Sequence, residues 1–194
     1  LPLRGKILNV ASATADKLNA NRELQDLTTA LGCGVGKHCR IDDLRYEKVI
    51  IMCDADVDGA HIAALLMTFF FREMRPLIER GHLFIAQPPL YRLSHGGTIE
   101  YARDEAHRQR LMATTFKGKK NVEVGRFKGL GEMNPKQLKE TTMDPATRQL
   151  LQVEVHDIEG KPTAEIIEDL MGKKPELRFR FIQDNAKLVE ELDV

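Results

Sequence analysis

The chain has 194 residues with 29 acidic and 29 basic side chains, which excludes a uniformly basic nucleic-acid binder. Its 42% apolar and 30% charged content is ordinary for a globular protein of one or two domains. The longest mostly apolar run, residues 62–71, is about half the length of a membrane span, and no secretory signal pattern is present, so we expect no membrane association. Three irregularly spaced cysteines predict a reducing compartment. Because the chain begins with Leu1, we expect a piece of a longer protein.

The first half of the chain alternates between helix and strand patterns. Apolar and small residues spaced by three and four predict a helix over 13–31, and the β-rich run KVIIMC predicts a buried strand over 48–53. A long and mostly apolar helix is predicted over 59–79, followed by a second buried strand over 82–86. This strand–helix–strand order predicts an α/β fold with a parallel sheet.

The second half is predicted to hold shorter elements. In chain order these are a hairpin of residues 91–93 and 99–103, a helix over 104–114, a strand over 121–127, a short helix beginning at Asn134-Pro135, a strand over 148–155, a helix over 163–172 and a last helix from Pro175. Asp104 and Thr163 are expected to cap the helices that they begin.

Charge is unevenly distributed along the chain. Residues 151–194 carry 11 acidic and 6 basic side chains, whereas residues 1–150 carry 18 and 23. The densest basic segment, residues 117–140, has seven Lys or Arg against three Glu. This pattern is typical of a surface that faces a polyanion, and equally of a solvated lysine-rich loop, so both interpretations stay open.

Three aspartates follow the first predicted strand directly. Asp54, Asp56 and Asp58 alternate, and alternating strand residues point to one side. Crowded carboxylates repel one another, and a hard divalent cation relieves that repulsion at the carboxyl edge of a parallel sheet. The pattern therefore predicts a metal site; the alternative is an acidic helix N-terminus, which favours the helix dipole. An EF-hand is excluded because position 12 of the loop is Leu65, where that loop needs Glu.

Two further strings combine basic side chains with glycine. They are LRGKILN at residues 3–9 and RFKGLGEM at residues 126–133. Glycine lets the backbone approach a phosphate closely, so both strings predict contacts with phosphate groups.

Five strings together resemble the Toprim and carboxyl-terminal region of the B subunit of bacterial type IIA topoisomerases. They are LPLRGKILNV at 1–10, DADVDGAHI at 54–62, AQPPLYR at 86–92, FKGLGEMNPKQLKETTMDP at 127–145 and IEDLMGKKPELRFRFIQDNA at 167–186. The resemblance covers the whole chain in the right order. Within the family, DGAHIA at 58–63 and MGKKPE at 171–176 resemble the topoisomerase IV type more than the gyrase type, which is the alternative.

The resemblance implies a Toprim-type, Rossmann-like parallel sheet flanked by helices, with a small hairpin and a helical C-terminal tail. Residues 1–115 are then the Toprim core with the hairpin, without its N-terminal acidic strand-turn. Residues 116–194 are the basic glycine loop and the C-terminal tail.

The resemblance also implies Mg²⁺-dependent DNA cleavage and religation during ATP-driven double-strand passage. Asp54 is then the ligand next to the scissile phosphate and shares a second ion with Asp56, while Asp58 supports or completes the cluster. The residues implied to contact DNA are Lys6, Asn9, His61, Lys128 and Arg178. For Arg178 a salt bridge within the tail is the alternative, and Arg4 lies in a region that resembles an inhibitor-contacting part of the family.

In this family the remaining parts of the machinery lie elsewhere. The resemblance places a metal-ligating glutamate in a Glu-Gly-Asp-Ser string upstream, an ATPase domain further upstream, and the nucleophilic tyrosine on the A subunit. Tyr46, Tyr91 and Tyr101 match no such role, so we expect the chain alone to be inactive. The expected assembly is an A2B2 heterotetramer on DNA, cytoplasmic and chromosome-associated. A non-catalytic, metal-stabilised DNA-interaction module is the alternative from another class.

Overall fold

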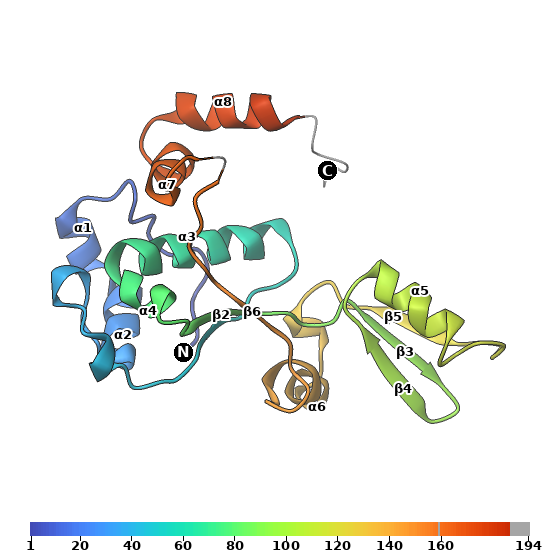
Figure 1. Cartoon of the computed structure of the whole chain (residues 1–194). Coiled ribbons are helices and arrows are strands. Elements are labelled where there is room, and N and C mark those ends of the chain that lie inside the picture. Colours follow the sequence, from blue (N-terminus) through green and yellow to red (C-terminus); the bar gives the residue numbers. More distant parts are fainter. Residues whose placement is uncertain (159, 187–194) are drawn as a thin grey trace. The chain divides into compact units, whose positions relative to one another are not determined.

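The computed structural model describes residues 1–158 and 160–186 and divides into two compact units (Figure 1). The helical unit comprises residues 1–49, 61–84 and those from 152 onward; the hairpin unit comprises residues 50–60 and 85–151. The domain boundary at residue 115 stays a prediction, since these compact units divide the chain along other lines.

Three short strands form a sheet in the order β1-β2-β6. Two helices, α3 and α4, connect β1 to β2, which is the predicted strand–helix–strand order. At β6, the Val153 N–H donates to the Leu83 carbonyl (2.9 Å) and the Gln87 N–H donates to the Gln149 carbonyl (3.0 Å), so this strand runs antiparallel to β2. The α/β class is confirmed, with an antiparallel third strand. The elements are β1 (Val49–Ile51), α3 (Val57–Glu73), α4 (Arg75–Glu79), β2 (Leu83–Ala86) and β6 (Leu150–Gln152).

Two helices predicted as continuous are interrupted. The helix predicted over 13–31 is divided at Asn21, whose side chain accepts the Leu24 N–H (3.0 Å) and caps α2. The helix predicted over 59–79 begins at Val57 and breaks at Met74, because Pro76 lacks an N–H and its ring would clash with the preceding turn. The remaining helices of the helical unit are α1 (Ala15–Ala20), α2 (Arg22–Leu31), α7 (Thr163–Met171) and α8 (Pro175–Asn185), with 3₁₀ turns at Gly36–His38 and Ile41–Asp43.

Helix α3 supplies much of the core of the helical unit. Phe69 and Phe70 are buried and meet edge to face, with ring centroids 5.5 Å apart. The buried Thr68 hydroxyl donates to the Ala64 carbonyl (2.7 Å), so its polar group is satisfied. None of the described helices is long and apolar enough to cross a membrane.

The hairpin unit is built on a three-stranded antiparallel sheet in the order β4-β3-β5. The predicted hairpin is confirmed, with His95 opposite Thr98 across a two-glycine turn, and β5 adds to its other side. Helix α5 lies beside this sheet, where Leu93, Ala102 and Phe116 form a small buried core (Figure 1). The elements are β3 (Tyr91–His95), β4 (Thr98–Ala102), α5 (Glu105–Ala113), β5 (Glu123–Arg126), a 3₁₀ turn at Leu130–Glu132, α6 (Pro135–Leu138) and a π turn at Lys139–Met143.

One of the two predicted helix caps is confirmed. The Asp104 carboxylate accepts the His107 N–H (2.6 Å) at the start of α5. Thr163 does not cap α7: Pro162 is the N-cap residue, and the Thr163 hydroxyl donates to the His156 carbonyl (2.6 Å). Proline has no side-chain acceptor, so α7 begins without a side-chain cap.

Candidate metal and DNA site

The three aspartates are exposed and lie in the hairpin unit, Asp54 and Asp56 on the turn between β1 and α3 and Asp58 at the start of α3. Asp56 directly precedes α3, and its Oδ1 accepts the Gly59 N–H (2.6 Å) as an N-cap does. Asp58 lies in the first turn of α3, where a carboxylate favours the helix dipole. Asp56 and Asp58 therefore lie where the alternative, an acidic helix N-terminus, expects carboxylates.

Asp54 is held differently, by a loop far away in the sequence. Its Oδ1 accepts the Leu130 N–H (2.7 Å), and its carboxyl group lies against Gly129, where an added Cβ would come within 2.9 Å of the carboxyl carbon. The Asp54 backbone is packed equally tightly, because a Cβ on Gly59 would meet the Asp54 carbonyl oxygen at 2.0 Å. Two glycines thus let Asp54 fit between the start of α3 and the glycine loop.

Burial and the negative charge of the turn are the causes of a raised pKa at the neighbouring Cys53. Partial burial raises the pKa of the Cys53 thiol first, and the carboxylates of Asp54 and Asp56 raise it further. Both carboxylates are therefore near this thiol, which agrees with their lying on the same turn.

The donor set fits a hard divalent cation. Within residues 1–158 and 160–186, no three His, Cys, Asp or Glu side chains converge as metal ligands, so the structure does not bring the predicted three carboxylates together. Asp54 and Asp56 still offer exposed carboxylate oxygens two residues apart. Mg²⁺ usually keeps several waters and takes only one or two carboxylates together with substrate phosphates. A two-carboxylate turn is compatible with that requirement.

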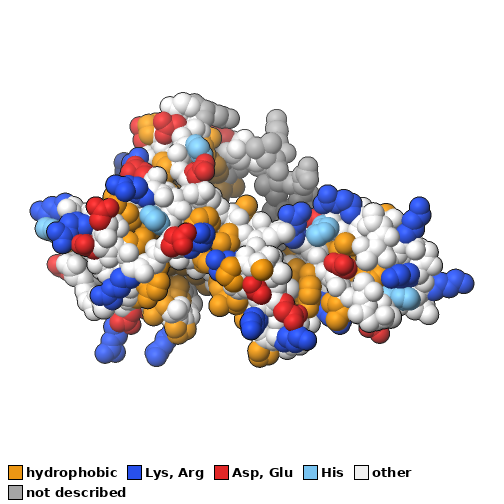
Figure 2. Space-filling model, turned by 60° about the horizontal axis from the view of Figure 1, so that its bottom comes forward, with side chains coloured by type: hydrophobic (Ala, Val, Ile, Leu, Met, Phe, Trp, Pro, Cys, Tyr) orange, Lys and Arg blue, Asp and Glu red, His pale blue; other side chains and the backbone are white. Residues whose placement is uncertain are grey.

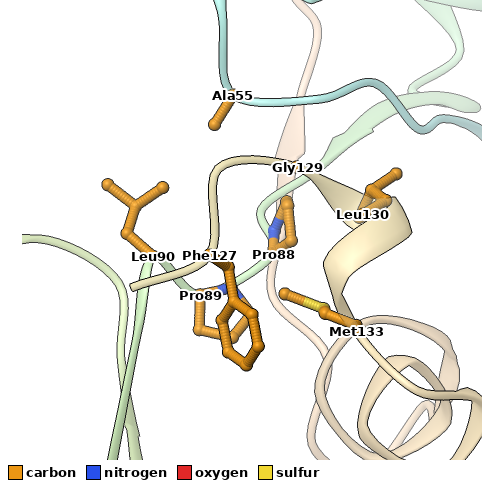
Figure 3. Close-up of a pocket in the computed structure, with 8 residues that line it drawn as sticks. All are labelled: Ala55, Pro88, Pro89, Leu90, Phe127, Gly129, Leu130 and Met133. Atoms are coloured by element: carbon orange, nitrogen blue, oxygen red, sulfur yellow. The ribbon is translucent and has the colours of Figure 1, made fainter. Parts of the chain in front are cut away.

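A close-packed apolar support lies behind the glycine loop. Figure 3 shows Phe127 and Met133 of the loop beside Pro88 and Pro89. The Phe127 N–H also donates to the Leu90 carbonyl (2.8 Å). This packing gives a structural role to the two prolines of the string at 86–92 and to Phe127 and Met133 of the string at 127–145. The residues around the small pocket are Ala55, Pro88, Pro89, Leu90, Phe127, Gly129, Leu130 and Met133.

The N-terminal string belongs to the helical unit. Ile7 and Val10 are buried and anchor it, while Arg4 and Lys6 are exposed on either side of Gly5. Gly5 has a φ of 118°, which L residues rarely adopt. The string therefore presents two basic side chains around a glycine, as predicted.

Asn9 and Arg178 have a structural role that the sequence did not reveal. The Asn9 Nδ2 donates to the Met171 carbonyl (2.8 Å), and the Arg178 Nη1 donates to the carbonyls of Leu170 (3.2 Å) and Gly172 (2.9 Å). These three consecutive carbonyls end α7, where no helical N–H is available to them. The partners of Arg178 are carbonyls, whereas the predicted alternative was a salt bridge.

The remaining predicted DNA contacts are exposed. His61 lies on α3 in the helical unit, and the Lys128 side chain extends from the glycine loop of the hairpin unit. Residues 90–126 carry eight basic and four acidic side chains. Lys and Arg side chains correspondingly outnumber acidic ones on the hairpin part of the face shown in Figure 2. The basic excess lies in residues 90–126, because the hairpin unit as a whole has 12 basic and 10 acidic side chains.

Two family models match parts of this chain. Residues 1–88 match the family described as Toprim domain, and residues 119–183 match the family described as DNA gyrase B subunit, carboxyl terminus. The chain belongs to the Toprim and carboxyl-terminal region of the bacterial topoisomerase B subunits. The recognition made from the sequence strings is confirmed.

Relatives of this B-subunit region align over the whole chain. It is 63% identical to the DNA topoisomerase 4 B subunit of Caulobacter vibrioides and 57% identical to that of Bartonella bacilliformis, in each case covering 28% of the relative. It is 53% identical to the DNA gyrase B subunit of Halalkalibacterium halodurans, covering 30% of it. The chain thus spans less than a third of these relatives, and the identities favour topoisomerase IV over gyrase, as predicted.

Sequence reasoning missed two contacts of the candidate site. The carboxylate of Glu132 accepts the Lys128 N–H (2.7 Å) and closes the glycine loop on itself. The string RFKGLGEM predicts a loop that approaches phosphate groups. In the structure its backbone also donates a hydrogen bond, from the Leu130 N–H to the Asp54 carboxylate. No local sequence signal pairs Leu130 with a residue 76 positions away.

Proposed function

We propose that this chain is the Mg²⁺-dependent part of the DNA cleavage–religation site of a type IIA topoisomerase, of the topoisomerase IV type. In the whole enzyme, an isomerase, this site serves double-strand passage that relaxes and decatenates DNA. ATP is bound and hydrolysed by another domain of the B subunit. The A subunit supplies the nucleophilic tyrosine in an A2B2 heterotetramer. The enzyme acts in the bacterial cytoplasm, on the chromosome.

One observation carries the proposal. The exposed Asp54 carboxylate, at the end of a strand in a Toprim domain, is oriented by the backbone N–H of Leu130. A carboxylate fixed in this way is ready to bind a cation without first losing its own freedom of movement. Asp54 is the principal metal ligand in the proposal, Asp56 contributes to a second ion, and Asp58 supports the turn.

When bound, Mg²⁺ stabilises negative charge on the transferring phosphoryl group. The chain's own residues hold and orient what takes part in that step. Asp54 and Asp56 hold cation ligands on the exposed turn, and Gly59 and Gly129 provide the space that lets Asp54 approach the loop. Lys6, Lys128 and His61 contact the DNA backbone in the proposal, which positions DNA without selecting its sequence.

Asn9 and Arg178 are proposed to act on DNA mainly through the fold. Both bind carbonyls at the end of α7, so they hold the N-terminal string and α8 to that helix. Arg4 stays a proposed inhibitor-contacting residue because it is exposed beside Gly5.

A plasmid assay tests the function. The A subunit and an intact B subunit that contains this region are incubated with supercoiled and catenated DNA in the presence of Mg²⁺ and ATP. We expect decatenation and, after denaturation, a covalent adduct between DNA and the A subunit. The chain alone should leave the plasmid intact, because its described residues offer fewer than three converging ligands and its tyrosines match no nucleophile.

Other outcomes of the assay separate the alternatives. Negative supercoiling by the complete assembly would favour the gyrase type. Metal binding without cleavage by the complete assembly would favour a non-catalytic DNA-interaction module. Nicked or linear DNA produced by the purified chain alone would contradict the proposed division of roles between the subunits.

A further inference from the structure

The loop that contacts Asp54 is itself closed by hydrogen bonds. The Lys128 N–H donates to Glu132 Oε2 (2.7 Å), and the Glu132 N–H donates back to the Gly129 carbonyl (3.2 Å). Between these bonds the Leu130 N–H points out of the loop, to Asp54 Oδ1 (2.7 Å). The direction of this N–H therefore depends on a turn that the Glu132 carboxylate closes.

Gly129 is required here for space and not for its backbone angles. Its φ of −164° is extended backbone that any residue adopts. A Cβ at this position would lie 2.9 Å from the Asp54 carboxyl carbon and 3.0 Å from each of its oxygens. Any side chain would push the carboxylate away from the Leu130 N–H. By contrast, a Cβ on Gly131 meets nothing within 4 Å.

The hydrogen bond from Leu130 and the close approach of Gly129 together orient the Asp54 carboxylate. Oδ1 accepts the Leu130 N–H, and Oδ2 together with the second lone pair of Oδ1 stays available to a cation. Groups that orient a metal ligand in this way typically change metal affinity when they are removed. The apolar packing of Phe127 and Met133 against Pro88 and Pro89 keeps the loop in place from behind.

We propose that Glu132 and Gly129 are positioning residues for Asp54: Glu132 holds the Leu130 amide in place, Gly129 leaves room for the carboxylate, and together they orient it for a divalent cation. The proposal rests on the proposed function. It assigns to the string KGLGE a role in forming the metal site, beyond any contact of Lys128 with DNA. Glu132 does not touch the cation in this account.

Four variants of the 194-residue chain test the proposal. Glu132→Ala removes the acceptor, Glu132→Gln keeps an acceptor oxygen without the charge, Gly129→Ala crowds Asp54, and Gly131→Ala is the matched control in the same loop. Glu132 is exposed, so its substitution leaves the core intact even if Gly129→Ala disturbs the fold.

The first readout needs no catalysis. Mn²⁺, a paramagnetic substitute for Mg²⁺, is titrated while the backbone amide resonances near Asp54 are followed. We expect the Mn²⁺ concentration for half-maximal broadening to rise about tenfold or more in Glu132→Ala and Gly129→Ala. Glu132→Gln and Gly131→Ala should stay within about twofold of the unsubstituted chain. Hydrogen exchange of the Leu130 amide should quicken in Glu132→Ala and stay slow in Glu132→Gln.

The second readout is the Mg²⁺ dependence of cleavage by the reconstituted enzyme. We expect Glu132→Ala to raise the Mg²⁺ concentration for half-maximal cleavage, with cleavage recovered at high Mg²⁺ and restored by Glu132→Gln. Unchanged Mn²⁺ titrations in both Glu132→Ala and Gly129→Ala would overturn the proposal. Losses of Mn²⁺ affinity in Glu132→Gln and Gly131→Ala as large as the loss in Glu132→Ala would also overturn it. If the reconstituted enzyme does not cleave although the Mn²⁺ titrations shift, the proposed function fails and the positioning role stands.

Discussion

Removing the Arg178 side chain distinguishes a structural role from a DNA contact. In the structure its Nη1 donates to the carbonyls of Leu170 (3.2 Å) and Gly172 (2.9 Å) at the end of α7. A hydrogen bond from a charged donor contributes about 1.5–3 kcal/mol, and a cation near a helix C-terminus adds about 0.3–1 kcal/mol. Because Arg178 is half-buried, solvent screens part of these contributions. We therefore expect Arg178→Ala to lower the stability of this part of the chain by about 1–2 kcal/mol.

Hydrogen–deuterium exchange measures this loss where it occurs. A cost of that size should speed exchange of the α7 and α8 amides by roughly five- to thirtyfold, since local opening becomes more frequent. Arg180→Ala is the matched control on the same helix, because Arg180 is exposed. Unchanged exchange in Arg178→Ala, together with a DNA-affinity salt slope flatter by about 0.9, would refute the reasoning and assign Arg178 to a phosphate contact.

Three further predictions follow from other parts of the chain. Gly59→Ala should destabilise the chain by several kcal/mol in urea unfolding because its Cβ would meet the Asp54 carbonyl oxygen at 2.0 Å, while Gly131→Ala stays within about 0.5 kcal/mol; equal stability of the two variants would contradict this. Lys6→Ala and Lys128→Ala should each flatten the slope of log K for DNA against log salt by about 0.9, with little dependence on sequence; unchanged slopes in both would disprove phosphate contacts. Burial and the neighbouring Cys33 raise the pKa of Cys39 from 9.0 to about 11, so Cys39 stays protonated at pH 9, where half of an ordinary thiol is ionised. Its alkylation there should be about fiftyfold slower than that of a free thiol and should accelerate towards pH 11, and a rate equal to that of free cysteine would contradict the shift.

Local sequence patterns predicted the elements well and their interruptions less well. The hairpin around Gly96-Gly97 and the Asp104 cap depend on residues close in sequence, and both are confirmed. The breaks at Asn21 and Met74 were missed, because apolar periodicity continues across each of them. At these positions a polar cap and a nearby proline override the hydrophobic pattern.

The candidate site was predictable in its residues and not in its contacts. The spacing of the aspartates located the acidic turn, and the structure places Asp54, Asp56 and Asp58 on it. Which of them cap α3, and which one binds a distant amide, depends on tertiary packing. The Leu130 contact with Asp54 spans 76 positions, and the Asn9 contact with Met171 spans 162. Periodicity carries no information over such separations.

The most direct test of the account compares Asp54→Ala with Asp58→Ala in the reconstituted enzyme. The covalent adduct between DNA and the A subunit is trapped and quantified across a Mg²⁺ titration. We predict that Asp54→Ala abolishes the adduct at every Mg²⁺ concentration, whereas Asp58→Ala retains part of it, since Asp58 lies in the first turn of α3. Equal loss in the two variants, or recovery of Asp54→Ala at high Mg²⁺, would contradict the assignment of Asp54 as the principal metal ligand.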